Sequence, residues 1–149
     1  MGPTELEKGW KGIRVFESTR NDVERVFGKR TRGDSVQARY ETKEADIRVL
    51  YSTGSCINPG TLTGGFRARE ETVLEYDVVP TTTIYLKDLK IREKLYERYE
   101  DADVAGAVEY YSNDYAIRIS ASLTRSGEKI KSIRFGRTEQ QKLAFECGR

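Results

Sequence analysis

Five apolar residues occupy every second position between residues 115 and 123, and this alternation constrains the fold more than any other feature of the sequence. They are Tyr115, Ile117, Ile119, Ala121 and Leu123. Because successive side chains of a β-strand point to opposite faces, a period of two predicts a strand with one buried face and one wet face. Tight turns at Asn113-Asp114 and Ser126-Gly127 flank this strand.

Shorter alternating runs predict strands at 36–40, 45–51, 72–79, 107–111 and 129–135. A short helix is expected between Thr19 and Gly28, because Thr19 and Asp22 fit a capping box and Gly28 fits a helix end. Its apolar stripe would be Val23, Val26 and Phe27. The highly charged stretch 86–99 predicts a second helix, and residues 52–71, rich in Gly, Thr and Ser, predict a long loop.

The two halves therefore follow the same order of elements. Residues 13–80 are expected to form helix, strand, strand, loop and strand, and residues 84–136 helix, strand, strand, turn and strand. An irregular segment, 1–10, precedes them, and a tail, 137–149, follows. We predict one α+β domain over residues 1–149, with two degenerate helix-plus-antiparallel-strand repeats forming one sheet and the helices packed on one face. Any α+β domain of this size could show a similar order of helices and strands in its two halves, so the internal duplication is a hypothesis.

The two cysteines, Cys56 and Cys147, are too far apart in the sequence for a C-x-x-C motif. Cys56 lies in a Gly-rich loop and Cys147 near the C-terminus, so neither position is typical of a core residue. We predict that they form a disulfide. The alternative is a pair of unrelated thiols in a reducing compartment.

The composition excludes several classes of function. The chain has no His and only two Cys, which excludes imidazole catalysis, His-ligated metals and a four-thiolate zinc site. The nucleophile-elbow, Walker A and dinucleotide-binding glycine motifs are absent from the sequence. We therefore expect a protein that is not an enzyme and that uses no cofactor and no metal. Acidic residues such as Glu70, Glu71 and Asp114 leave a carboxylate-based hydrolase as a remote alternative.

The charge is nearly balanced, with 26 Lys and Arg against 24 Asp and Glu and a formal net charge of +2. Such a balance makes nucleic acid an unfavoured partner, although a cytosolic polyanion- or nucleic-acid-binding domain with free thiols is the alternative function. No run approaches the roughly 20 apolar residues that a membrane helix needs, so we expect no membrane span. The N-terminus lacks the layout of a signal peptide.

The segment Ser18–Lys29 resembles the Ser/Thr-x-x-Asp/Glu-Val-x-x-hydrophobic-hydrophobic-Gly helix of SmpA/OmlA-type envelope lipoproteins. The tandem helix-plus-sheet order is similar to that of β-lactamase inhibitor proteins. Over most of the chain, residues 10–28, the Tyr51-Ser52-x-Gly54-x-Cys56 loop, strand 72–74 and Cys147 resemble a family of uncharacterised exported bacterial proteins. These resemblances imply an extracytoplasmic protein, periplasmic or secreted after removal of a leader not present in this sequence. It would be a protein-binding or cell-envelope scaffold module whose partner is another protein or a component of the cell envelope, and no catalytic residues carry over.

The sheet face away from the helices supplies the candidate binding surface. Arg and Tyr are favoured at protein interfaces, so we predict that Arg48, Tyr111, Arg118 and Arg134 contact a partner. The alternative is that the charged residues of this face form cross-strand pairs that merely keep an exposed sheet soluble. The alternation assigns to this face Arg39, Arg48, Glu75, Asp77, Glu109, Tyr111, Arg118 and Arg134.

Overall fold

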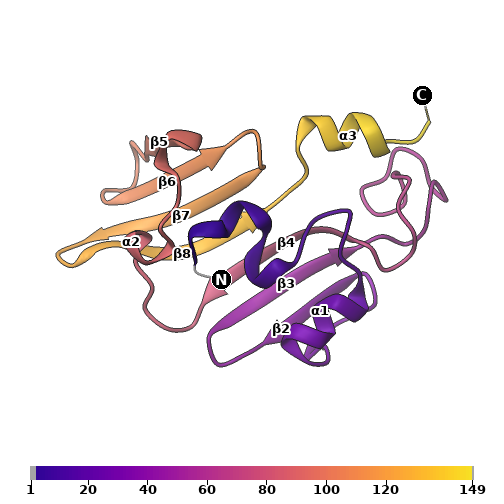
Figure 1. Cartoon of the computed structure of the whole chain (residues 1–149), viewed down its shortest axis with the longest axis horizontal. Helices are drawn as coiled ribbons and strands as arrows, with labels where there is room; N and C mark the ends of the chain where they lie inside the picture. The colour runs from indigo at the N-terminus through magenta and orange to yellow at the C-terminus, as the bar shows by residue number, and fades with distance from the viewer. Residues whose placement is uncertain (1–2, 149) are drawn as a thin grey trace.

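The computed structural model describes residues 3–148, and its strands form one antiparallel sheet in the order β1-β2-β3-β4-β8-β7-β6-β5 (Figure 1). The predicted α+β class is confirmed. In chain order the elements are the 3-10 helices η1 (Pro3–Lys8) and η2 (Trp10–Gly12), α1 (Arg20–Phe27), β1 (Arg32–Gly33), β2 (Gln37–Glu41), β3 (Ala45–Tyr51), β4 (Val73–Pro80), α2 (Leu86–Leu89), the 3-10 helix η3 (Glu93–Leu95), β5 (Glu97–Glu100), β6 (Ala107–Ser112), β7 (Ile117–Thr124), β8 (Gly127–Phe135) and α3 (Glu139–Phe145).

The main core lies on one side of the sheet, which we call the covered face. The α1 helix lies over β2 and β3, where the Tyr40 hydroxyl donates to Glu24 Oε2 at 2.9 Å (Figure 1). The N-terminal segment crosses β4, where the Tyr76 hydroxyl accepts from the Trp10 N–H at 2.8 Å and donates to the Ile13 carbonyl at 2.6 Å. The short α2 helix packs on β8. The opposite side of the sheet, the open face, therefore carries the alternate side chains of the same strands.

The first helix forms as its sequence predicts. The Thr19 N–H donates to Asp22 Oδ2 at 2.9 Å, which completes the capping box, and Gly28 ends the helix at φ 86°. Val23 is fully buried, but Val26 is 43% exposed. The predicted apolar stripe is therefore wrong at Val26, because only the side chains one turn apart, Val23 and Phe27, pack toward the sheet.

The second predicted helix, over residues 86–99, is wrong beyond its first turn. The α2 helix ends at Leu89, and Lys90 adopts the left-handed conformation at φ 49°. Residues 97–100 instead form β5, which pairs with β6 at the edge of the sheet. An isolated helix of this length is marginal in water, and pairing with β6 satisfies the backbone hydrogen bonds without requiring an apolar stripe, which this segment lacks.

Both ends of the chain are more ordered than the sequence predicts. In the segment predicted to be irregular, η1 places Leu6 in the core at 4% exposure, and Glu7 accepts from Arg92 Nε at 2.9 Å. In the predicted tail, α3 brings the Phe145 ring parallel to the Phe16 ring, with centroids 4.3 Å apart. Met1, Gly2 and Arg149 belong to these predicted segments but lie outside the described residues. Among residues 3–148, no helix is long and apolar enough to cross a membrane.

The internal repeat stays a prediction. The two halves meet where β4 pairs with β8 in the middle of the sheet. The helices differ, however, because α1 has 8 residues and α2 only 4. The 52–71 loop also has no counterpart of similar length in the second half.

Candidate functional site

All four predicted binding residues lie in one row across the open face. Each member of the row is the cross-strand neighbour of the next, so the register of six strands, and not the sequence spacing, brings them together. We call this set the arginine row. From β2 to β6 it runs Arg39, Arg48, Asp77, Arg134, Arg118 and Tyr111.

The row places like charges side by side twice. Arg39 is directly opposite Arg48, and Arg134 is directly opposite Arg118. Asp77 is the acidic member between the two arginine pairs. Like charges at directly opposed positions destabilise a sheet unless other groups compensate them.

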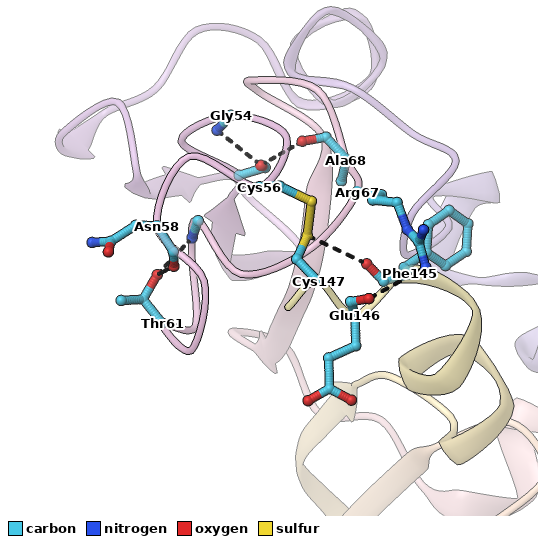
Figure 2. Close-up of a disulfide and its surroundings, with 11 residues drawn as sticks. Gly54, Cys56, Asn58, Thr61, Arg67, Ala68, Phe145, Glu146 and Cys147 are labelled. Carbon is cyan, nitrogen blue, oxygen red and sulfur yellow. Dashed lines mark hydrogen bonds between the residues drawn. A yellow bond between two sulfur atoms is a disulfide. The ribbon is translucent and has the colours of Figure 1, made fainter. Parts of the chain in front are cut away.

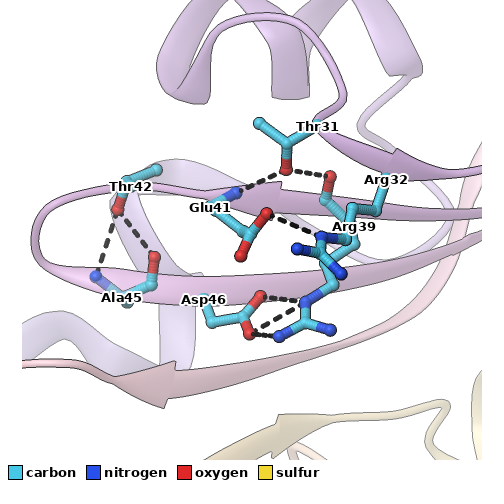
Figure 3. Close-up of polar contacts among 7 residues, drawn as sticks. All are labelled: Thr31, Arg32, Arg39, Glu41, Thr42, Ala45 and Asp46. Atoms are coloured by element: carbon cyan, nitrogen blue, oxygen red, sulfur yellow. Dashed lines mark hydrogen bonds and ion pairs between the residues drawn. The ribbon is translucent and has the colours of Figure 1, made fainter.

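Nearby carboxylates compensate three of the four arginines. Arg39 Nε lies 2.9 Å from both carboxylate oxygens of Asp46 (Figure 3), and this hydrogen bonding raises the pKa of the Arg39 guanidinium. Arg134 Nε donates to Asp77 Oδ1 at 2.8 Å, and Arg134 Nη2 lies 3.4 Å from Asp77 Oδ2. Arg118 Nε lies 3.6 Å from a Glu109 oxygen. For these three arginines the structure supports the alternative of charge pairs on a solvated sheet.

Arg48 is different from the other members of the row. Its side chain is exposed, and within residues 3–148 no hydrogen bond, ion pair or ring contact joins it to another residue. Asp77, its acidic neighbour, already has both oxygens directed to Arg134. Arg48 is therefore the arginine of the row whose positive charge is not balanced by a carboxylate.

Tyr111 ends the row as an aromatic neighbour of Arg118. The Arg118 guanidinium carbon lies 5.4 Å from the centre of the Tyr111 ring, within the range of a cation–π interaction. Tyr111 is half-buried although it belongs to the polar side of its strand. The contact stiffens both side chains, which lowers the entropy that they would lose on binding a partner.

Two hollows meet at Arg48 on the open face. The first has a volume of about 490 Å³ and extends toward β1 and the 52–71 loop, where Arg32 and Leu62 line it. The second has a volume of about 410 Å³ and extends toward β7, where Arg118 and Ser120 line it. Arg48 and Asp77 line both hollows, so the unpaired arginine lies where the two hollows adjoin, and we call the two hollows together the depression.

The 52–71 loop covers one end of the open face. Leu50 and Leu74 occupy this end and pack with Ala68 of the loop in a second, smaller core. Leu50 lies on the same strand face as the exposed Arg48, and this packing explains why an apolar residue is placed there. The Ser52 hydroxyl holds the loop in place by donating to the Ala68 carbonyl at 2.8 Å and accepting from the Gly54 N–H at 3.1 Å.

The predicted disulfide between Cys56 and Cys147 is present, with the two Cα atoms 5.7 Å apart (Figure 2). Backbone hydrogen bonds run beside it, from the Cys147 N–H to the Gly65 carbonyl at 2.9 Å and from the Cys56 N–H to the Phe66 carbonyl at 3.0 Å. The bridge therefore joins the segment that follows α3 to the loop that bounds the first hollow.

Arg137 is a residue of this region that sequence reasoning did not place. Its side chain is only 13% exposed, and its Nη1 donates to the Leu74 carbonyl at 3.1 Å and lies 3.0 Å from Glu75 Oε1. Its guanidinium carbon lies 5.3 Å from the centre of the Phe66 ring. Arg137 follows the last strand, where no alternating pattern assigns a face, so only the three-dimensional structure could place it.

Buried tyrosines on the covered face form a separate polar network. The hydroxyls of Tyr40 and Tyr51 lie 2.7 Å apart, and the Arg20 guanidinium carbon lies 4.4 Å from the centre of the Tyr51 ring. Burial raises the pKa of Tyr40 to about 12, and burial together with the bond to Tyr40 also raises the pKa of Tyr51. Both hydroxyls are therefore neutral near neutral pH, and their role is to satisfy one another inside the core.

The acidic residues considered for a hydrolase are dispersed. Glu71 Oε2 forms an ion pair with Arg20 Nε at 2.8 Å, and Asp101 Oδ1 accepts from the N–H groups of Asp103 and Val104 in a turn. Within residues 3–148, no group of three or more His, Cys, Asp or Glu residues is arranged to hold a metal ion. Absence of enzymatic activity stays a prediction.

Comparison with protein-family models finds no match, and comparison with curated proteins finds none either. Comparison with solved structures finds a DUF4309 family protein (YjgB) from Bacillus subtilis subsp. subtilis str. 168. The TM-score is 0.45 and the sequence identity 12%, with 90% of this chain and 91% of that chain covered. The resemblances to SmpA/OmlA-type lipoproteins and to β-lactamase inhibitor proteins gain no support from these comparisons and stay predictions.

Proposed function

We propose that this chain is a non-enzymatic protein-binding or cell-envelope scaffold module, located outside the cytoplasm, whose open sheet face holds another protein or a component of the cell envelope. The observation that carries the proposal is the unpaired Arg48 at the junction of the two hollows. Arg48 stands directly opposite Arg39, a placement that costs stability within the chain. A bound partner that supplies the missing countercharge would remove this cost.

The composition of the open face favours a protein over a polyanion. Asp46, Asp77 and Glu109 lie among the arginines and pair with three of the four, so a chain of phosphates would meet both repulsion and attraction. Protein interfaces, in contrast, combine polar pairs with Arg and Tyr anchors beside apolar residues. Leu62 lines the first hollow, and Tyr111 lies beside Arg118, which lines the second.

The disulfide supports a location outside the cytoplasm. Structural disulfides persist in oxidising compartments, and reducing compartments keep thiols free. Protein isolated from its native compartment should therefore show no free thiol at Cys56 or Cys147 before reduction, as measured by alkylation and intact mass. Two alkylated thiols in such a sample would contradict this part of the proposal.

The binding role can be tested by crosslinking in the source organism. A photo-crosslinking residue at Ser120, in the second hollow, should yield a defined adduct with one protein. That adduct should disappear in a variant carrying Arg48→Thr and Tyr111→Ala. The control is Arg125→Ala, which removes an arginine from the exposed turn between β7 and β8. Equal adduct yields in all three proteins would overturn the proposal.

A further inference from the structure

We propose that Arg48 receives the side-chain carboxylate of an acidic residue from a peptide segment of the partner, with apolar residues of that segment in the flanking hollows. This inference rests on the proposed function and names the chemistry of the partner.

Arg48 has free hydrogen-bonding capacity that its neighbours cannot use. Asp46 directs both oxygens to Arg39, and Asp77 directs both to Arg134. The Arg48 guanidinium therefore keeps its planar set of N–H donors available to an external acceptor. A guanidinium binds a carboxylate through two parallel N–H···O bonds, which gives both strength and orientation.

The charge pattern around Arg48 selects one isolated negative charge. Every other arginine of the row has its own carboxylate, so the region offers one unbalanced positive charge. A second negative charge on the ligand would lie near Asp77 or Glu75, because both line the same hollow as Arg48. A single Asp or Glu between uncharged residues satisfies this pattern, whereas the repeated charges of a nucleic acid do not.

The lining of the hollows selects apolar neighbours for that acidic residue. Leu50 and Leu62 line the first hollow beside Arg48, and Leu62 is 50% exposed. An exposed leucine at the rim of a hollow gains stability when a partner's apolar side chain covers it. A segment that crosses the strands along the row would then place an apolar residue against Leu62 and its carboxylate on Arg48.

The test uses the full-length oxidised protein and short peptides with both ends blocked, so that a glutamate side chain is the ligand's one carboxylate. The probe is acetyl-Ser-Leu-Glu-Leu-Ser-amide, and the matched peptide carries Gln in place of Glu. Binding is followed by the NMR signal of Arg48 Nε–Hε during titration to about 5 mM, a range suited to weak peptide affinities. The signal of Arg125, an exposed arginine away from the depression, is the internal reference.

We expect the Glu peptide to shift the Arg48 signal and the Gln peptide to bind about tenfold more weakly, because it lacks the charge-assisted pair. Arg48→Thr should weaken the Glu peptide by a similar factor, read from the backbone amides of β3, while Arg125→Ala should not change it. Arg48→Glu should invert the preference toward a Lys-containing peptide. Retention of the far-UV spectrum and melting temperature shows that each variant is folded.

Three outcomes would overturn the inference. These are equal binding of the Glu and Gln peptides, binding only when the peptide has a free C-terminal carboxylate, and tighter binding of a thymidine oligonucleotide at the same amides. If the Glu peptide does not bind but the yield of the crosslinked adduct still depends on Arg48, the proposed function is retained. Only the proposal that Arg48 binds a carboxylate is then rejected. If the peptide does not bind and the adduct does not depend on Arg48, both proposals are rejected and the open face is a solvated surface.

Discussion

The two faces of the sheet are built from the same strands and differ in almost every physical respect. On β8, Ile133 is fully buried on the covered face, while its neighbour Arg134 is exposed on the open face. On β4, Tyr76 is buried and has both a donor and an acceptor, while Asp77 pairs across the open face. On the covered face every large side chain must fit its neighbours. On the open face water screens charges, so that like-charged neighbours can persist.

This difference between the two faces supports the proposed binding role of the open face. A buried tyrosine without a partner would cost stability, so the covered face pairs Tyr40 with Tyr51 and Glu24. The open face leaves Arg48 unpaired because water hydrates it at little cost. Binding sites commonly contain residues that do not maximise the stability of the folded chain, and the unpaired Arg48 is such a residue.

Removing the disulfide should have the largest effect, because it releases the loop that covers one end of the open face. We expect Cys56→Ser with Cys147→Ser to lower the free energy of unfolding by about 4 kcal/mol, since the bridge closes a loop of 91 residues in the unfolded chain. Urea denaturation measures this. The reduced wild-type protein is the control and should match the double variant. A loss below about 1 kcal/mol would mean that Arg137 and the small core hold the loop without the bridge.

Adjacent substitutions on β8 test the contrast between the faces directly. Ile133→Ala should lower the free energy of unfolding by about 3 kcal/mol, because it leaves a cavity in the main core. Arg134→Ala should cost less than about 1 kcal/mol, because its pair with Asp77 is largely solvated. Thermal and urea unfolding of both variants give the comparison. Equal losses would show that the open face is covered in solution.

Two tyrosine hydroxyls that both bond to glutamate sharpen the comparison further. Tyr40→Phe should cost about 1 to 2 kcal/mol, because it leaves the buried Tyr51 hydroxyl without its partner. Tyr99→Phe is the matched control, since the Tyr99 hydroxyl bonds to Glu97 on the edge strand and the residue is 53% exposed. We expect no measurable loss from it in urea unfolding. A loss at Tyr99 as large as that at Tyr40 would contradict the account of the two faces.

The smallest effect is expected at Arg48. Arg48→Thr should leave the free energy of unfolding within about 0.5 kcal/mol of the wild type, or raise it, because Thr suits a strand and the repulsion from Arg39 disappears. The melting temperature in low salt and in about 0.5 M salt measures this, since added salt screens the repulsion in the wild type. A clear loss of stability would show that Arg48 has a structural partner.

Much of the fold follows from local patterns. The period-two runs predicted six of the eight strands to within two residues at each end, but they did not predict the edge strands β1 and β5. The capping residues Thr19 and Asp22 predicted α1. Residues 86–99 were mispredicted because a charged segment without a clear stripe can be a helix or an edge strand. Its backbone pairing with β6 decided between them.

The sequence by itself determined which side chains share a face, because a strand allows its residues only two directions. It also indicated that Cys56 and Cys147 lie in positions where they can pair. Only the tertiary structure decided that four arginines and Asp77 form one row, that Asp77 binds Arg134 and leaves Arg48 unpaired, and that a loop covers Leu50. The physical reason is that these relations depend on the register between strands distant in the chain, which no local period encodes.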